Sequence, residues 1–188
     1  MNRSRITLSL MAVGLTAFAQ TRSTEQILQV ARATWPGSHS VGIVCNYARS
    51  GETIRAMLDA FAPGSTVTVL DVRSRASIYT ACVSLTGYSP QFVLLLPDDP
   101  IVHDGSWEAR QVIFHMNFRK IPTLATTPIA LAQGAWAVMG PATGNQLQVN
   151  PALQGYIEAY GTPMYPNRPS AKNTGAGTRT TLSVIAAF

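Results

Sequence analysis

Hydrophobic runs of strand length alternate along the chain with stretches in which apolar residues recur at helical spacing. In the clearest helical stretch, four apolar residues occupy positions i, i+3, i+4 and i+7 and therefore share one face: Ile54, Met57, Leu58 and Phe61. The pattern predicts strands at residues 41–47, 66–72, 92–96, 122–126 and 135–139. It predicts helices at residues 51–62, 76–85, 106–119, 128–133 and 151–160, after a first helix that starts at a capping box, residues 23–26.

Five strands that alternate with helices predict a parallel sheet, because each right-handed crossover must lay a helix on the sheet. We therefore expect an α/β three-layer sandwich with a five-stranded parallel sheet in the flavodoxin-like order 2-1-3-4-5. The helix at residues 106–119 is expected to turn an apolar stripe toward this sheet. The stripe consists of Trp107, Ala109, Val112, Ile113 and Met116.

The two ends of the chain differ from the part between them. Two arginines, an apolar run at residues 6–16 and the triplet Ala17-Phe18-Ala19 predict a signal peptide at residues 1–19. The apolar run is shorter than the ~20 residues of a membrane span. We expect a single α/β lobe at residues 20–161 and a soluble protein that is periplasmic or secreted.

Residues 162–188 are read as a Pro/Gly-rich C-terminal tail. Its last residues, 182–188, turn apolar again. They are either part of a flexible tail, or a final strand, or a clip onto a neighbouring chain.

Charge excludes one class of partner. The formal net charge is +5 at pH 7, but between residues 20 and 162 there are nine basic and nine acidic residues. The predicted folded part is thus neutral, whereas nucleic-acid-binding domains are usually basic. No nucleic acid is expected as a partner.

Cys45 and Cys82 are the only cysteines, in a predicted strand and a predicted helix. Their spacing is not that of a metal-ligand pair. In the expected strand order the helix of Cys82 crosses over the strand of Cys45, so a disulfide is geometrically possible in an oxidising compartment. Two buried free thiols are the alternative.

Polar residues follow three of the predicted strands. They are Asn46 and Tyr47 at the end of the first strand, Asp98 and Asp99 after the third, and Thr126 and Thr127 at the end of the fourth. In an open parallel sheet, ligands bind beyond the carboxyl ends of the strands. These six residues are therefore the predicted ligand-binding residues.

Other functions of Asp98 and Asp99, as a phosphoacceptor or a metal site, have less support. A receiver-type phosphoacceptor needs further acids after the first strand and a lysine after the fifth, where Cys45-Asn46 and Gly140-Pro141 stand. A metal site could recruit Asp98, Asp99, His103, Asp104 and Glu108. A crowded acidic loop is more often a solvated turn with helix caps, and either Asp104 or Ser106 is placed to cap the next helix.

Catalytic and cofactor motifs give no positive signal. A flavin or nucleotide phosphate at residues 50–53 would meet Glu52, which we place in the first turn of a helix, where its charge repels a phosphate. Neither a nucleophile elbow nor a Walker motif occurs. We expect no catalytic residues, no metal and no cofactor, and hence no enzyme.

Four segments resemble a known family. They are ILQVARATWPGSHSVGIVCN, FVLLLPDDPIV, RKIPTLATT and ALAQGAWAVMG, at residues 27–46, 92–102, 119–127 and 130–140. In this order they are similar to the second lobe of ABC-transporter substrate-binding proteins with the type I periplasmic-binding fold. The resemblance implies a single lobe of that fold, which binds a small organic ligand such as an amino acid.

By position, the resemblance implies that Asn46, Asp98 and Thr127 face the ligand, whereas Tyr47 stands where the family commonly has proline. One of the two acids would accept a hydrogen bond from a ligand amine, and the other would cap the loop. The resemblance covers the second lobe only, and a clamshell ligand is enclosed from two sides. A membrane transporter, a second lobe-like chain or a homodimer is expected to complete the site. The alternative is a non-catalytic periplasmic interaction or sensory module that keeps the lobe as a scaffold.

Overall fold

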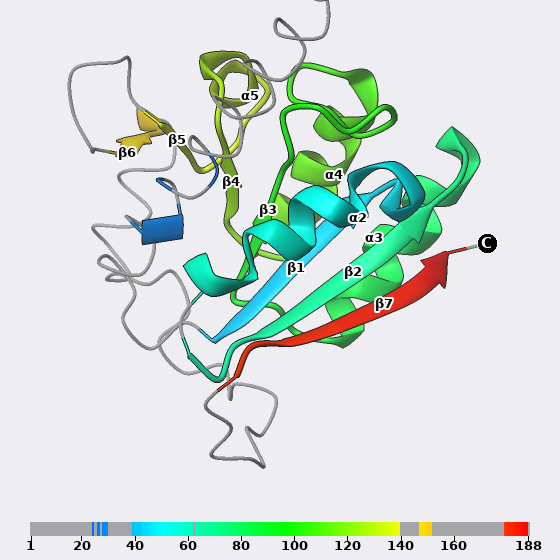
Figure 1. Ribbon diagram of the computed structural model, residues 1–188. Helices are drawn as coiled ribbons and strands as arrows, with labels where there is room; N and C mark the ends of the chain where they lie inside the picture. The colour runs from blue at the N-terminus through cyan, green and yellow to red at the C-terminus, as the bar shows by residue number, and fades with distance from the viewer. Residues whose placement is uncertain are drawn as a thin grey trace, which may run out of the picture.

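A computed structural model describes residues 24, 26, 28–29, 39–61, 63–139, 147–151 and 179–187. Its strands are β1 (Ser40–Cys45), β2 (Thr66–Val72), β3 (Phe92–Leu94), β4 (Thr123–Ala125), β5 (Ala137–Met139), β6 (Leu147–Val149) and β7 (Thr181–Ala187). They form one sheet in the order β6-β5-β4-β3-β1-β2-β7 (Figure 1). The α/β class and the mostly parallel sheet are confirmed.

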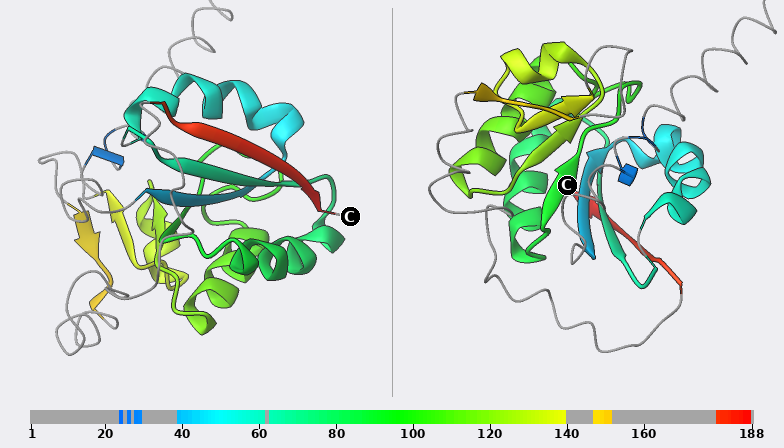
Figure 2. Two further views of the ribbon diagram at one scale, coloured as in Figure 1. Left: turned by 90° about the horizontal axis from the view of Figure 1, so that it is seen from below. Right: turned by 90° about the vertical axis from the view of Figure 1, so that its left-hand side faces the viewer.

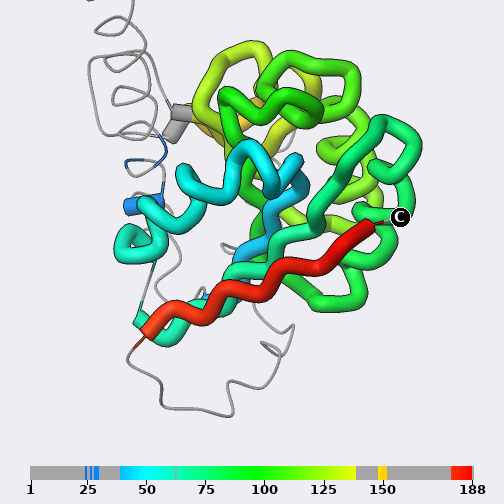
Figure 3. Tube along the Cα trace, turned by 45° about the vertical axis from the view of Figure 1, so that its right-hand side comes forward, coloured from blue at the N-terminus to red at the C-terminus, as the bar shows by residue number. Residues whose placement is uncertain are grey.

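The strand count and the complete order differ from the prediction. The five predicted strands are neighbours in the order β2-β1-β3-β4-β5, and their four pairings are parallel. The prediction of five strands was wrong, because β6 pairs antiparallel with β5 and β7 pairs parallel with β2. Figure 3 shows β7 running beside β2 along its length. The apolar end of the chain is thus a final strand.

Helices cover both faces of the sheet. They are α2 (Tyr47–Ala56), α3 (Ile78–Gly87), α4 (Trp107–Phe118) and α5 (Pro128–Ala132), with two 3-10 turns, η1 (Leu58–Ala60) and η2 (Arg75–Ser77). Successive strand residues point to opposite faces. Ile43 of β1 therefore packs in one core cluster with Ile54 of α2, and Val44 packs in another with Ile78 of α3 and Ile113 of α4. Figure 2 shows α2 on one side of the sheet and α3 and α4 on the other.

The predicted inner stripe of α4 was wrong at one residue. Ala109, Val112, Ile113 and Met116 are fully buried, but Trp107 is 62% exposed. At about 100° per residue, Trp107 lies between about 140° and 240° around the helix from the other four. It therefore belongs to the outer face of α4.

The two cysteines lie on opposite sides of the sheet. Cys45 belongs to the core cluster beneath α2, and Cys82 belongs to the cluster beneath α3 and α4. Both thiols are buried and free. The sheet between them explains why the predicted crossover does not bring them together.

Some predictions lie outside the described residues. They are the signal peptide at residues 1–19, the helix at residues 151–160 apart from its first residue, and the tail before residue 179. Among the helices that are described, none is long and apolar enough to cross a bilayer.

Candidate functional site at the strand ends

The carboxyl ends of β1, β3 and β4 carry the predicted ligand-binding residues. Strand order reverses between β1 and β3, since β2 lies on one side of β1 and β4 lies on the far side of β3. Such a switch point is where open α/β sheets leave a crevice for ligands. Three carboxylates hold the loops at this edge.

Asp99, in the loop after β3, is buried and accepts four hydrogen bonds. Its Oδ2 accepts from the backbone N–H of Asn46 at 2.8 Å and from the hydroxyl of Ser50 at 2.6 Å. Its Oδ1 accepts from the backbone N–H groups of Ile101 and Val102 at 2.9 and 2.7 Å. A carboxylate offers about four lone-pair sites, so this one is fully used within the chain. Asp99 thus fastens the loop after β3 to the start of α2.

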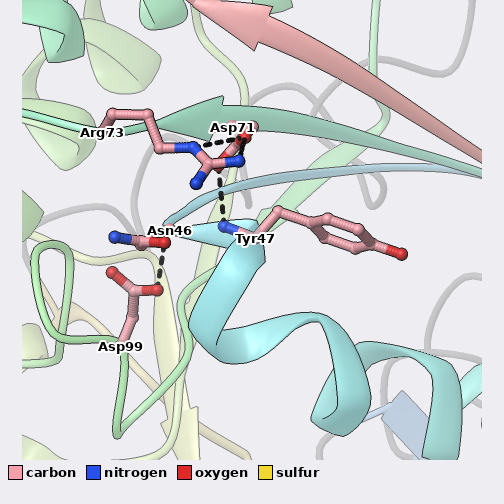
Figure 4. A network of polar contacts seen from close by, with 5 residues as sticks. All are labelled: Asn46, Tyr47, Asp71, Arg73 and Asp99. Carbon is pink, nitrogen blue, oxygen red and sulfur yellow. Dashed lines mark hydrogen bonds and ion pairs between the residues drawn. The ribbon is translucent and has the colours of Figure 1, made fainter.

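Asp71, near the end of β2, holds the same helix start from the other side. Its Oδ1 accepts from the backbone N–H of Tyr47 at 2.9 Å, and its Oδ2 pairs with Arg73 at 2.7 Å (Figure 4). Asp71 and Asp99 therefore occupy two of the N–H groups that a helix leaves unpaired at its start. The sequence reasoning missed Asp71. Its signal was the one charged residue in the strand, near its end.

These two contacts also correct the predicted helix boundary. The helix begins at Tyr47 rather than at residue 51, so Glu52 lies beyond the first turn. A phosphate at the true start of this helix would meet the carboxylates of Asp71 and Asp99 and not Glu52. Negative charge at a helix N-terminus is favourable for the helix, but two carboxylates there repel a phosphate.

Asp104 joins the loop after β3 to the turn after β4. Its Oδ2 accepts from the backbone N–H groups of Thr126 and Thr127, both at 3.0 Å, and from the Thr126 hydroxyl at 3.2 Å. Burial raises the pKa of Asp104, and the hydrogen bonds from the two threonines partly oppose this rise. Of the two predicted caps of α4, Ser106 fills the position, since its Oγ accepts from the N–H of Ala109 at 2.9 Å.

The predicted site residues occupy different environments. Asn46, Tyr47, Thr126 and Thr127 are half-buried, Asp98 is exposed and Asp99 is buried. Asn46 and Asp99 are joined directly by a hydrogen bond. Thr126 and Thr127 are joined to the same loop through Asp104.

The side chain of Tyr47 extends away from the other site residues. Figure 4 shows its ring pointing away from Asn46 and Asp99. Its hydroxyl accepts from Nε of Arg55 at 3.2 Å, and the Arg55 guanidinium lies 5.6 Å from the ring centroid. At the strand ends, Tyr47 contributes its backbone rather than its ring.

Asp98 and Asn46 differ from the other acids and amides at this edge in exposure and in hydrogen bonding. Partial burial raises the pKa of Asp98, and the nearby His103 partly offsets this. The side-chain oxygen of Asn46 is shielded from solvent and has no hydrogen-bond partner among the described residues. A shielded oxygen without a donor is costly, and a ligand N–H would satisfy it.

The acids do not assemble into a metal-binding group within the described part of the chain. Asp99 and Asp104 accept hydrogen bonds from backbone N–H groups, and Glu108 is buried in an ion pair with Arg75 at 2.7 Å. Burial, together with the charges of Asp99 and Asp71, raises the pKa of the Cys45 thiol well above its usual range. A protonated thiol is a poor nucleophile and a poor metal ligand.

No family model matches the chain, and no curated protein sequence matches it significantly. The resemblance to substrate-binding proteins therefore stays a prediction from the four sequence segments.

Proposed function

We propose that this chain is an exported, non-catalytic binding protein, similar to the second lobe of an ABC-transporter substrate-binding protein. It binds a small organic ligand that carries a protonated amine, such as an amino acid, at the carboxyl ends of β1, β3 and β4. One observation carries the proposal: at the switch point, buried Asp99 fixes the loop after β3 to the start of α2, while its neighbour Asp98 stays exposed.

The charge of this edge supports an amine rather than an anion. Asp71, Asp99 and Asp104 accept hydrogen bonds from the chain itself, and Asp98 is the exposed carboxylate of the group. Arg73, a cation at the same edge, is paired with Asp71. An opposite charge within a few ångströms favours the ionised carboxylate. A ligand ammonium would therefore lower the raised pKa of Asp98 on binding.

A single lobe provides one wall of the site, and we propose that a partner provides the other. The partner is a membrane transporter, a second lobe-like chain or a second copy in a homodimer. Tyr47 and Ile101, which the sequence places at this edge, are half-buried and pack against the two core clusters. A partner would therefore contact this edge chiefly through polar groups.

The test is a thermal shift with the twenty standard amino acids and matched amines lacking a carboxylate. A ligand at about 100 times its Kd stabilises a protein by about 2.7 kcal/mol. For a chain of this size that corresponds to a rise in Tm of roughly 5–11 °C. Asp98→Ala should abolish the rise, whereas Asp59→Ala, which removes an exposed acid on η1, should leave it intact. Loss of the rise in both variants, or no rise with any compound, would refute the proposal.

A second function, a non-catalytic periplasmic interaction or sensory module, is favoured by a separate observation. Large aromatic side chains are exposed on α3 and α4, on the side of the sheet opposite α2. In this case the chain should bind a protein without any small ligand.

A further inference from the structure

Four aromatic side chains project from the outer face of α3 and α4. Tyr79, Trp107, Phe114 and Phe118 are 63%, 62%, 68% and 75% exposed. The outer face of a surface helix normally carries polar and charged residues, because its apolar stripe turns to the core. Here α4 has an inner apolar stripe and an outer aromatic one. Contiguous exposed apolar side chains of this kind mark interaction sites.

These rings border two adjoining cavities, which together we call the α3–α4 groove. One cavity, of about 360 Å³, lies beside Trp107 and Arg110, and the other, of about 260 Å³, lies beside Phe118 and Arg119. Both cavities are lined by Tyr79 of α3 and by Phe114 of α4. From Trp107 to Phe118 the groove follows α4 for about three turns, or roughly 16 Å.

The exposed charges along the groove are positive. The guanidinium of Arg110 lies 5.5 Å from the ring centroid of Trp107, and that of Arg119 lies 5.9 Å from the ring centroid of Phe118. The one carboxylate on α3 and α4, that of Glu108, is buried and paired with Arg75. An acidic partner would therefore meet two arginines held at the two ends of the groove.

We infer that the α3–α4 groove binds an acidic, amphipathic segment of a partner protein. A bulky apolar side chain of the segment enters each cavity, and its carboxylates pair with Arg110 and Arg119. Helical segments bind to grooves in this way through side chains spaced at i, i+4 and i+7. The aromatic and arginine composition is that of protein interface cores, which are depleted in lysine and acids.

The exposed area and the positive charge of the groove favour an acidic protein segment over a second copy of this chain or a lipid surface. Four rings at about two-thirds exposure offer roughly 500 Å², and the flanking side chains bring the face toward the ~800 Å² per partner of a specific interface. A second copy would set Arg110 and Arg119 near like charges, which is unfavourable. Discrete cavities between projecting rings fit side chains of a structured partner better than they fit a fluid lipid surface.

The test uses a phage-displayed random peptide library panned on the full protein. Enriched peptides should combine aspartate or glutamate with tryptophan, phenylalanine or leucine, and the best peptide is then synthesised for Kd measurements by fluorescence anisotropy. Phe114→Ser and Arg110→Glu should each weaken binding by about tenfold or more, and high salt should weaken it in the wild type. Arg55→Glu is the matched control, because Arg55 stacks on an aromatic ring in the same way but lies on α2.

Several results would overturn the inference. One is a peptide pool that is enriched equally on the Phe114→Ser protein, or that lacks acids. Another is a concentration-dependent dimer in sedimentation that Phe114→Ser abolishes, which would assign the groove to a second copy. A third is flotation with phosphatidylglycerol-containing vesicles that both variants lose, which would assign it to a lipid surface. If Phe114→Ser fails to fold, Arg110→Glu carries the test, since Arg110 is exposed. The residues tested in the groove are not those of the strand-end site, so loss of amino-acid binding would not affect this result.

Discussion

Removal of the Asp99 carboxylate should destabilise the protein more than removal of the adjacent Asp98 carboxylate. Asp99 is 1% exposed and accepts four hydrogen bonds, whereas Asp98 is exposed. In Asp99→Ala the four donors remain in place, and the alanine offers them no acceptor. The pair of variants therefore compares two neighbouring acids that differ in burial.

The magnitude follows from the donors that are left behind. The hydrogen bonds from the Val102 N–H and the Ser50 hydroxyl are buried, and those from the Asn46 and Ile101 N–H groups are partly buried. A buried donor without a partner costs about 1–3 kcal/mol, and the partly buried ones can bond to water at a lower cost. The expected loss is about 4 kcal/mol, a large part of the 5–15 kcal/mol that is typical of a folded protein.

Urea unfolding followed by circular dichroism measures this difference. Asp99→Ala should lower the unfolding midpoint with an unchanged m-value, and its Tm should fall by roughly 8–16 °C. Asp98→Ala should change the free energy of unfolding by less than about 1 kcal/mol, as exposed substitutions usually do. If the two variants lose the same stability, Asp99 does not hold the loop after β3 to α2, and the description of the site is wrong.

Two further predictions concern groups whose pKa is raised by burial or partial burial. Because burial raises the pKa of Asp104, the folded state binds this proton more tightly than the unfolded state, and the contribution of Asp104 to stability falls as the pH rises above its unfolded value of about 3.9. The Tm of Asp104→Asn minus the Tm of the wild type should therefore increase from about pH 4 to about pH 7. A Tm difference that does not change with pH would contradict the raised pKa of Asp104. Burial also raises the pKa of Cys82 to about 12 and that of Cys45 still further. Iodoacetamide should leave both thiols unmodified in the native protein and alkylate both in denaturant; an intact mass that shows native alkylation or a disulfide would contradict this.

The core elements could be predicted because their signals are local. The bounds of β2 match the predicted residues 66–72, and the inner residues of α4 match apart from Trp107. The prediction for Trp107 was wrong because the residue was assigned to the core by its apolar type. Its angle around α4 places it on the outer face. Large apolar residues also occur on protein surfaces, so residue type alone does not assign a position to the core.

The contacts at the strand ends could not be predicted, because they join residues far apart in the chain. Asp71 and Asp99 lie 24 and 53 residues from the backbone N–H groups that they bind, those of Tyr47 and of the N-cap Asn46. The start of α2 at Tyr47 depends on these contacts, since its own N-cap, Asn46, makes no side-chain capping bond. The sequence indicated only that polar residues would gather at this edge.

The sequence by itself determined the alternation of strands and helices and the neighbours of the five predicted strands, because periodicity and the handedness of crossovers restrict the possible arrangements. Only the tertiary structure decided which of two adjacent aspartates is buried, since the direction of each side chain depends on how the loop after β3 packs on α2. It also decided the position of β7, which pairs in register with β2 from Thr181 opposite Thr66. The apolar residues 182–188 allowed a final strand, but its partner follows from the free edge of the assembled sheet and not from either segment alone.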